Sequence, residues 1–331
     1  MTMDEMISNL LDTLQIDELH TCDRMSVATL SRPDETGPKY LTMSQGFDQE
    51  VLTVEEISDS GSVPELSVIN RGELHVLLLD GEEIRGAKQN RVLNTSILVA
   101  PGSKCTVPVS CTEQGRWHYT TSRFEDSEVV MAQSLRQRKQ ASVSKNVREH
   151  QSFHSDQGEV WEGVDTLHCL LDISSETGAM RDAYEARQED LEKYVRAFAD
   201  IRDVNGIAVF LEGKLAGLDF ISYRPAMNDL LPKLIGSYAM DALCEEENGR
   251  REPDPGEVQS LLSRIGRCAL EVQKSEGVGD DARLDGPDLQ GAALIALNTV
   301  IHLSAFIKAD EKSFKGGMSS FSHRRQFRDS M

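Results

Sequence analysis

Short apolar runs, each bounded by turn residues, dominate the first 120 residues of the chain. The runs with the length and composition of strands are residues 25–30, 51–54, 66–70 and 74–79. Asp80-Gly81 directly follows the last run and predicts a two-residue hairpin turn. Residues 96–99 and 106–110 predict a second hairpin around Pro101. We therefore expect this part of the chain to be mostly β-sheet.

Helical periodicity follows in the middle of the chain. Residues 125–147 contain no glycine or proline and predict a helix. In residues 182–198, Tyr184, Leu191 and Phe198 lie on one stripe and predict an amphipathic helix. Residues 4–14 predict a further short helix near the start of the chain.

The last third of the chain returns to extended structure. Residues 207–211 and 215–221 flank Glu212-Gly213, and residues 292–297 and 300–307 flank Asn298-Thr299; each arrangement predicts a hairpin. The predicted fold class is α+β. It has a β-rich N-terminal half with hairpins, a helical middle, and further β-hairpins and helices in the C-terminal half.

These patterns also suggest how the chain divides. Residues 1–20 are expected to form an N-terminal helix, and residues 308–331 a polar tail. Residues 21–307 are expected to form one α+β domain. Two closely packed lobes, residues 21–123 and 124–307, are the alternative.

Composition narrows the class of protein. The chain has 331 residues and a formal net charge of −20, which argues against broad binding to nucleic acid or to an anionic membrane surface. There is no apolar run of about 18 residues and no basic, apolar leader, so we expect no membrane-spanning helix. The six cysteines have no CxxC spacing and favour a reducing, cytoplasmic location.

Metal and common cofactor motifs are also missing from the sequence. His150 and His154 have the i, i+4 spacing of a helical metal site, but no third ligand accompanies them. A phosphate-binding loop, a dinucleotide glycine fingerprint, HExxH and GxSxG are all absent. We therefore expect neither a metal nor a cofactor.

The first candidate site is the polar segment of residues 86–96. Lys88 and Arg91 carry the charges that hold phosphate. Gln89, Asn90 and Asn94 offer donors and acceptors suited to ribose hydroxyls or a base edge. The alternative is a solvated turn in which the amides bond the local backbone.

A second polar segment lies about 20 residues further on. Arg116 can clamp an anion, Trp117 can stack on a planar ring, and Gln114 can bond a ligand. Glu113 can act as a general base in a polar pocket. The alternative is a structural ion pair of Glu113 with Arg116 beside a core tryptophan.

Further candidates lie on either side of these segments. Glu83 would sit near the first segment if its strand turns it inward, and it is a second candidate general base. Asp156 and Gln157 either contribute to the site or cap a helix. The stretch between Glu128 and Glu149 has basic but no acidic residues. It predicts a solvated amphipathic helix or, alternatively, the lining of an anion pocket.

The chain resembles a known bacterial family, the domain associated with ADP-ribosylglycohydrolases and rhodanese-type phosphatases. The similarity spans residues 65–306. The matching stretches are LLLDGEEIRGAKQNRVLNTSILVAPGSKCTVPVSCTEQGRW, SDQGEVW, SETGAMRDAYE, GKLAGLDF and LLPKLIGSYAMDAL. The resemblance implies a role in NAD or ADP-ribose metabolism with a nucleotide-like small molecule as partner. It carries over no catalytic residues.

Three hypotheses follow. The first is a metal-independent hydrolase of an ADP-ribose derivative, in which Glu83 or Glu113 activates water. The second is a non-catalytic sensor or binding module for the same class of ligand. The third is an interaction scaffold without a small ligand.

Overall fold

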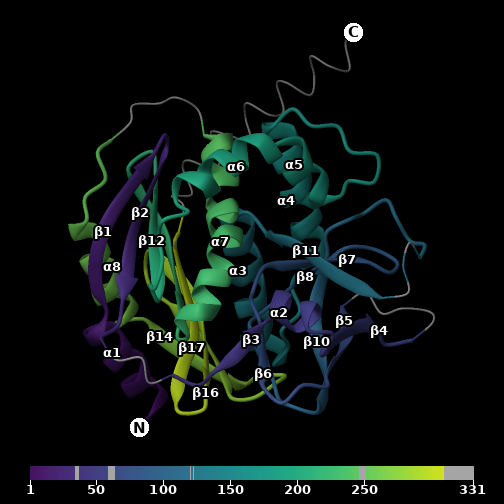
Figure 1. The fold of residues 1–331 in the computed structure, drawn as a ribbon, viewed down its shortest axis with the longest axis horizontal. Coiled ribbons are helices and arrows are strands. Elements are labelled where there is room, and N and C mark those ends of the chain that lie inside the picture. Colours follow the sequence, from purple (N-terminus) through teal and green to yellow (C-terminus); the bar gives the residue numbers. More distant parts are fainter. Residues whose placement is uncertain (34–36, 59–63, 120, 122, 246–250, 309–331) are drawn as a thin grey trace.

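The computed structural model describes residues 1–33, 37–58, 64–119, 121, 123–245 and 251–308. It contains three β-sheets, with helices α7 (Arg224–Cys244) and α3 (Gln133–His150) running between the largest sheet and the two smaller ones (Figure 1). The α+β fold class predicted from the sequence is confirmed. The predicted tail, residues 308–331, lies outside the described residues except for Lys308.

The largest sheet has eight strands in the order β1-β2-β12-β13-β17-β16-β15-β14, and every neighbouring pair is antiparallel. Its strands are β1 (Gln15–Cys22), β2 (Met25–Ser31), β12 (Gly206–Leu211), β13 (Lys214–Ile221), β14 (Ala269–Lys274), β15 (Asp280–Asp285), β16 (Leu289–Ala296) and β17 (Thr299–Ile307). The two N-terminal strands therefore belong to a sheet that the C-terminal third of the chain builds.

The two smaller sheets come from the N-terminal half. A six-stranded antiparallel sheet has the order β11-β7-β8-β10-β5-β4, and a three-stranded sheet has the order β3-β6-β9. Their strands are β3 (Tyr40–Thr42), β4 (Leu52–Glu56), β5 (Glu65–Asn70), β6 (His75–Leu78), β7 (Glu82–Gly86), β8 (Arg91–Leu93), β9 (Ile97–Val99), β10 (Ser103–Cys111) and β11 (Phe124–Val130).

Six further helices complete the described fold. They are α1 (Met3–Thr13), α2 (Met43–Asp48), α4 (Gln157–Leu170), α5 (Met180–Ala186), α6 (Gln188–Ala197) and α8 (Gly256–Ile265). The largest apolar cluster takes residues from all three sheets and from α3, α4, α5, α6 and α7, so the central helices bury apolar surface on both sides. No helix among the described residues is long and apolar enough to span a membrane.

Two of the predicted hairpins are confirmed. Strands β12 and β13 pair across Glu212 and Gly213, whose φ angles of 48° and 75° are those of a type I′ turn. Strands β16 and β17 pair across Leu297 and Asn298, which also have positive φ. In both cases the partner strand is the next one along the chain.

The other two predicted hairpins are wrong, although their strands exist. Gly81 has a φ of 88°, and the Glu82 amide donates to the Leu79 carbonyl, as in a type II turn. This turn carries the chain from β6 in one sheet to β7 in another. Likewise, β9 pairs with β6, whereas β10 pairs with β5 and β8.

Three helix boundaries also differ from the sequence prediction. Residues 124–130 form strand β11, and α3 begins only at Gln133. The helix expected over residues 182–198 is two helices, α5 and α6, which meet at Arg187 with φ −110°. Residues 15–20, expected to extend the first helix, belong to β1 and pair with β2.

Candidate functional site

The two polar segments found in the sequence lie side by side. Cys111 at the end of β10 pairs with Arg91 at the start of β8 in antiparallel register. The residues just before β8 therefore run alongside those just after β10. The Asn90 amide donates to Glu113 Oε2 at 3.2 Å, and Gln89 Nε2 donates to the Glu113 carbonyl at 2.8 Å.

Glu113 and Arg116 form a buried ion pair. Arg116 Nη2 lies 2.6 Å from Glu113 Oε2, and their side chains are 9% and 7% exposed. Arg116 also donates to the Ala87 carbonyl at 2.9 Å and to Asn90 Oδ1 at 3.1 Å. The sequence also allowed a structural ion pair of Glu113 with Arg116 beside a core tryptophan. The ion pair is present, but Trp117 is half-exposed and is not a core residue.

The environment of Glu113 favours its ionised form. Burial raises the pKa of this carboxyl group, but hydrogen bonds from Arg116, the Asn90 amide and Thr177 outweigh burial and bring the pKa below its usual value. An ionised carboxylate that already accepts this many hydrogen bonds is a weak proton acceptor. Its clearest role is to hold the two segments together.

A third segment, residues 175–181, docks onto the same place and was not among the predicted site residues. The Gly115 amide donates to the Thr177 carbonyl at 2.6 Å, and the Met180 amide donates to the Thr112 carbonyl at 2.8 Å. Thr177 Oγ1 donates to Glu113 Oε1 at 3.0 Å. A Cβ atom at Gly115 would lie 2.9 Å from Thr177 Cα, so this approach needs a glycine.

A surface pocket of about 370 Å³ opens where the three segments meet. Of the predicted residues, Asn90, Glu113 and Arg116 line it. Gly86, at the start of the first predicted segment, lines it too. The lining residues that sequence reasoning missed are Arg85, Thr121, Glu125, Ala179, Arg181, Asp182 and Glu185. Arg181 and its neighbours lie in SETGAMRDAYE, one of the family-like stretches, and that was the only sequence signal for them.

Two arginines in this pocket have partly exposed side chains. Arg85 on β7 is half-exposed and lies 3.8 Å from Glu125. Arg181 on α5 is 21% exposed, and its Nε lies 3.1 Å from Glu185 Oε1. Ion pairs this exposed contribute little stability and can rearrange around a ligand.

Glu83 is fully buried just behind the pocket. Its carboxylate accepts hydrogen bonds from Thr112 Oγ1 and Ser127 Oγ, each at 2.6 Å. Burial raises the pKa of Glu83 to about 7, even though both hydroxyls and the charge of Arg181 lower it. Arg181 Nη1 donates to Ser127 Oγ at 3.1 Å, so one hydroxyl separates Glu83 from a side chain of the pocket.

Lys88 and Trp117 lie together beside this cluster. Lys88 Nζ is 5.3 Å from the centre of the Trp117 ring and 5.0 Å from that of Tyr119. Trp117 is 48% exposed, and Gln114 is exposed. Neither Lys88, Gln114 nor Trp117 lines the pocket itself.

Arg91 and Asn94 do not line the pocket. Arg91 is fully buried, and its Nη1 donates to Gln89 Oε1 at 3.0 Å. Asn94 Nδ2 donates to the Phe153 carbonyl at 3.1 Å, and its Oδ1 accepts from Ser110 at 2.7 Å. The side-chain amide of Asn94 thus hydrogen-bonds neighbouring segments of the chain.

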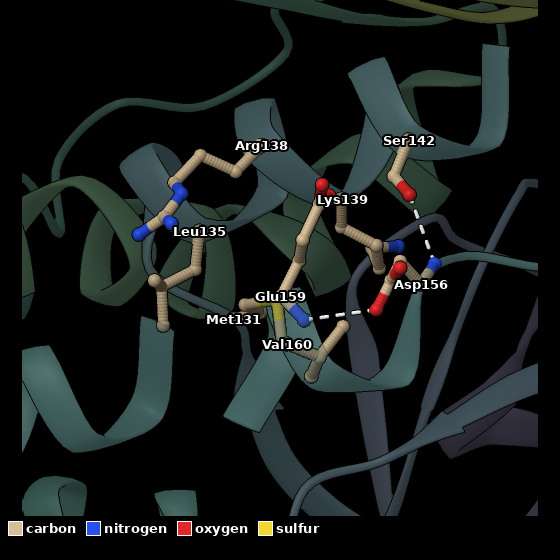
Figure 2. A pocket seen from close by; sticks show the side chains of 8 residues that line it. All are labelled: Met131, Leu135, Arg138, Lys139, Ser142, Asp156, Glu159 and Val160. Atoms are coloured by element: carbon tan, nitrogen blue, oxygen red, sulfur yellow. Dashed lines mark hydrogen bonds between the residues drawn. The ribbon is translucent and has the colours of Figure 1, made fainter. Parts of the chain in front are cut away.

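Asp156 and Gln157 hold helix α4 in place. Asp156 caps α4 by accepting from the Gly158 and Glu159 amides. Gln157 exchanges two hydrogen bonds of 2.8 Å with the backbone of Cys111. Figure 2 shows Asp156 in a small cavity between α3 and α4, which it lines with Lys139. The cavity measures about 10 Å³, which is room for about one water molecule and not for a nucleotide.

Two basic residues of α3 are buried where solvent was expected, whereas Arg138, Lys145 and Arg148 are partly or fully exposed. Arg136 is 0% and Lys139 2% exposed. Arg136 pairs with Asp219 on β13, and Lys139 with Asp80 in the turn before β7. A third buried cation, Lys233 on α7, pairs with Glu82 and Asp126. These pairs tie the central helices to the sheets on both sides.

The residues that the structure describes contain no group of three or more His, Cys, Asp or Glu able to hold a metal ion. The fold and the pocket define the class: an α+β protein of mostly antiparallel sheets, with a polar pocket beside its six-stranded sheet. Over residues 13–306 the chain matches the ARG and Rhodanese-Phosphatase-superfamily-associated Protein domain, and it belongs to that family. None of the curated proteins and none of the solved structures compared with the chain matches it.

Proposed function

We propose that the pocket between β7, the segment after β10 and α5 binds an ADP-ribose-type ligand. The family name associates the domain with ADP-ribosylglycohydrolases, which act in the chemistry of that ligand. A volume of about 370 Å³ lies within the usual range of small-molecule sites. The pocket is thus large enough for at least the diphosphate and one ribose.

The observation that carries this proposal is that Arg85 and Arg181, from two separate elements, line one pocket. Guanidinium groups bind phosphate oxygens through two parallel hydrogen bonds, and both side chains are partly exposed. Asn90 and the carboxylates of Asp182 and Glu185 offer acceptors for ribose hydroxyls. A ligand that is anionic at one end and rich in hydroxyls at the other fits this mixture.

Within this proposal the predicted residues divide into two groups. Glu113, Arg116 and Gln89 position the wall of the pocket through the hydrogen bonds they make with one another and with the backbone. Lys88 and Trp117 lie outside it, where Trp117 can stack on a base that extends from the pocket. Binding is what this arrangement supports most directly, as in a sensor or binding module.

Hydrolysis of the ligand is the second candidate function, and one observation favours it. A carboxyl group with a pKa of about 7, such as that of Glu83, can accept and release a proton near neutral pH. Its hydrogen bond with Ser127, which also bonds Arg181, links this carboxyl group to the pocket. Glu113 is a poorer base because its pKa is lowered.

Calorimetric titration with ADP-ribose tests binding, with Arg181→Gln as the pocket variant. Arg196→Gln is the matched control, since Arg196 is an exposed helical arginine paired with Glu192. We expect Arg181→Gln to weaken binding by about tenfold or more and the control to leave it unchanged. No binding by the wild-type chain, or equal affinities for both variants, contradicts the proposal.

Mass spectrometry after incubation with ADP-ribose or NAD separates the two candidate functions. A binding module leaves the ligand intact. A hydrolase releases products, and Glu83→Gln abolishes their release while retaining binding.

A further inference from the structure

Arg91 on β8 is a fully buried cation whose hydrogen-bonding capacity is only partly used. Its Nη1 donates to Gln89 Oε1 at 3.0 Å and approaches the Asn90 carbonyl at 3.4 Å. Its Nε and Nη2 have no hydrogen-bond partner among the residues that the structure describes. These two nitrogens form one edge of the guanidinium group, the edge that binds both oxygens of an oxyanion at once.

Helix α4 holds the strand neighbour of Arg91 in place. Gln157 on α4 bonds the backbone of Cys111, the residue paired with Arg91. Burial raises the pKa of the Cys111 thiol, although the charge of Arg91 and a hydrogen bond from Trp161 lower it.

The charge of Arg91 is not balanced by a direct ion pair among the described residues. Glu113, which acts on Arg91 electrostatically, is engaged by Arg116. Glu56 on β4 acts on Arg91 electrostatically, but both of its oxygens are buried without a hydrogen-bond partner in the described structure. Burial accordingly lowers the pKa of Arg91.

Trp117 covers this cation on one side. The Arg91 guanidinium carbon lies 5.7 Å from the centre of the Trp117 ring, and Lys88 Nζ lies 5.3 Å from the same centre. Because Trp117 is 48% exposed, its side chain can turn outward without disturbing the core. Two cations would then face the opening.

We propose that the free edge of Arg91 is a closed subsite for an oxyanion such as a phosphate group, and that Trp117 is its cover. This subsite is separate from the pocket, because Arg91 does not line the pocket. An oxyanion there would accept hydrogen bonds from Nε and Nη2 of Arg91. It would remove the free-energy cost of leaving those donors unpaired.

If the oxyanion is a phosphate of the ADP-ribose-type ligand, the subsite is part of the proposed site and rests on the proposed function. If it is a separate anion, the subsite does not depend on that function. Inorganic pyrophosphate is the probe that separates the two ideas. Calorimetry with the wild-type chain, Arg91→Lys and the control Arg196→Lys measures its affinity. Lysine keeps the charge at residue 91 but cannot present two parallel donors.

We expect Arg91→Lys to weaken pyrophosphate binding at least about tenfold and the control Arg196→Lys, at an exposed arginine of α6, to change it little. No pyrophosphate binding by the wild-type chain, or unchanged binding by Arg91→Lys, overturns the subsite. A second variant, Trp117→Ala, tests the cover while leaving Arg91 itself in place. It should raise the association rate for pyrophosphate, and an unchanged rate overturns the role of Trp117.

ADP-ribose titrated into the same proteins distinguishes the two proposals. If the wild-type chain binds ADP-ribose but Arg91→Lys binds it equally well, the subsite is wrong as a part of that ligand's site and the proposed function stands. If pyrophosphate binds through Arg91 and ADP-ribose does not bind at all, the subsite stands and the proposed function is wrong.

Discussion

Arg136 on α3 donates two hydrogen bonds to the Asp219 carboxylate on β13, at 2.7 and 3.1 Å, and both side chains are fully buried. Tyr238 on α7 donates to the same carboxylate at 2.8 Å. Burial raises the pKa of Asp219, but the charge and hydrogen bonds of Arg136 outweigh it and hold the pKa well below its usual range. This carboxylate thus joins both central helices to the largest sheet.

Replacing Asp219 by Asn should destabilise the chain strongly. The change leaves Arg136 buried without its counter-charge, which typically costs about 3–5 kcal/mol. Urea denaturation of the wild-type and variant chains measures the difference. Asp285→Asn is the control, because Asp285 pairs with Arg148 and Lys308 at the surface, where a pair is worth about 0–1 kcal/mol. Equal losses of unfolding free energy in the two variants would show that the buried pair contributes no more to stability than the surface pair.

Gly115→Ala should separate the loop that carries Thr177 from the candidate site. The new Cβ would lie 2.9 Å from Thr177 Cα and 3.0 Å from its carbonyl oxygen, which is too close for backbone atoms. We expect a loss of about 1–3 kcal/mol in urea denaturation, the usual effect of overpacking. Gly236→Ala, in helix α7 with open space around the position, should instead be neutral or stabilise by up to about 1 kcal/mol. A Gly115→Ala chain as stable as Gly236→Ala would argue against the close approach.

Glu83 should make the chain less stable as the pH rises from about 4.5 to about 7. Its pKa is about 7 in the folded chain and about 4.3 when unfolded, so over this interval the folded state binds more protons. The free energy of unfolding therefore falls with increasing pH, by up to about 3 kcal/mol from this group alone. Urea denaturation at a series of pH values measures the slope. Glu83→Gln should flatten it, and an unchanged slope in that variant would rule out Glu83 as its source.

We propose that residues 21–307 unfold as one unit. The supporting observation is that β2 pairs along its length with β12, from the other side of the boundary between residues 123 and 124. Calorimetry should give a single transition in which the calorimetric and van't Hoff enthalpies agree. Residues 21–123 expressed alone should lack a cooperative transition. Two separate transitions in the whole chain would favour two lobes.

The sequence predicted strands better than it predicted their partners. The turn at Glu212 and Gly213 joins strands that pair with each other, so the local pattern was sufficient. The turn at Asp80 and Gly81 has equally good turn residues but passes between sheets. Which strand lies beside which is decided by packing over long distances, and turn chemistry carries no information about it.

The burial of two basic side chains on α3 could not be predicted for the same reason. Arg136 and Lys139 have the composition of a solvated helix face. Their partners, Asp219 and Asp80, lie 83 and 59 residues away in the sequence. Only the folded structure shows that a carboxylate pairs with each of these two cations.

For the candidate site, the density of polar residues identified two segments that do come together. It did not separate residues that support the wall from behind, such as Gln89, from those that line the pocket, such as Arg181. Amides such as Gln89 and Asn94 bond neighbouring chain segments, which a sequence cannot distinguish from bonding a ligand. Whether these residues form a ligand site stays a prediction until binding is measured.

The order of strands in the largest sheet has a consequence for how the protein is made. As the chain leaves the ribosome, β1 and β2 emerge first, but β12, the second neighbour of β2, is complete only at Leu211. Until then the apolar residues of β2 lack their permanent cover and one strand edge is open, a configuration prone to aggregation during synthesis. We therefore expect newly made chains shorter than about 211 residues to depend on chaperones.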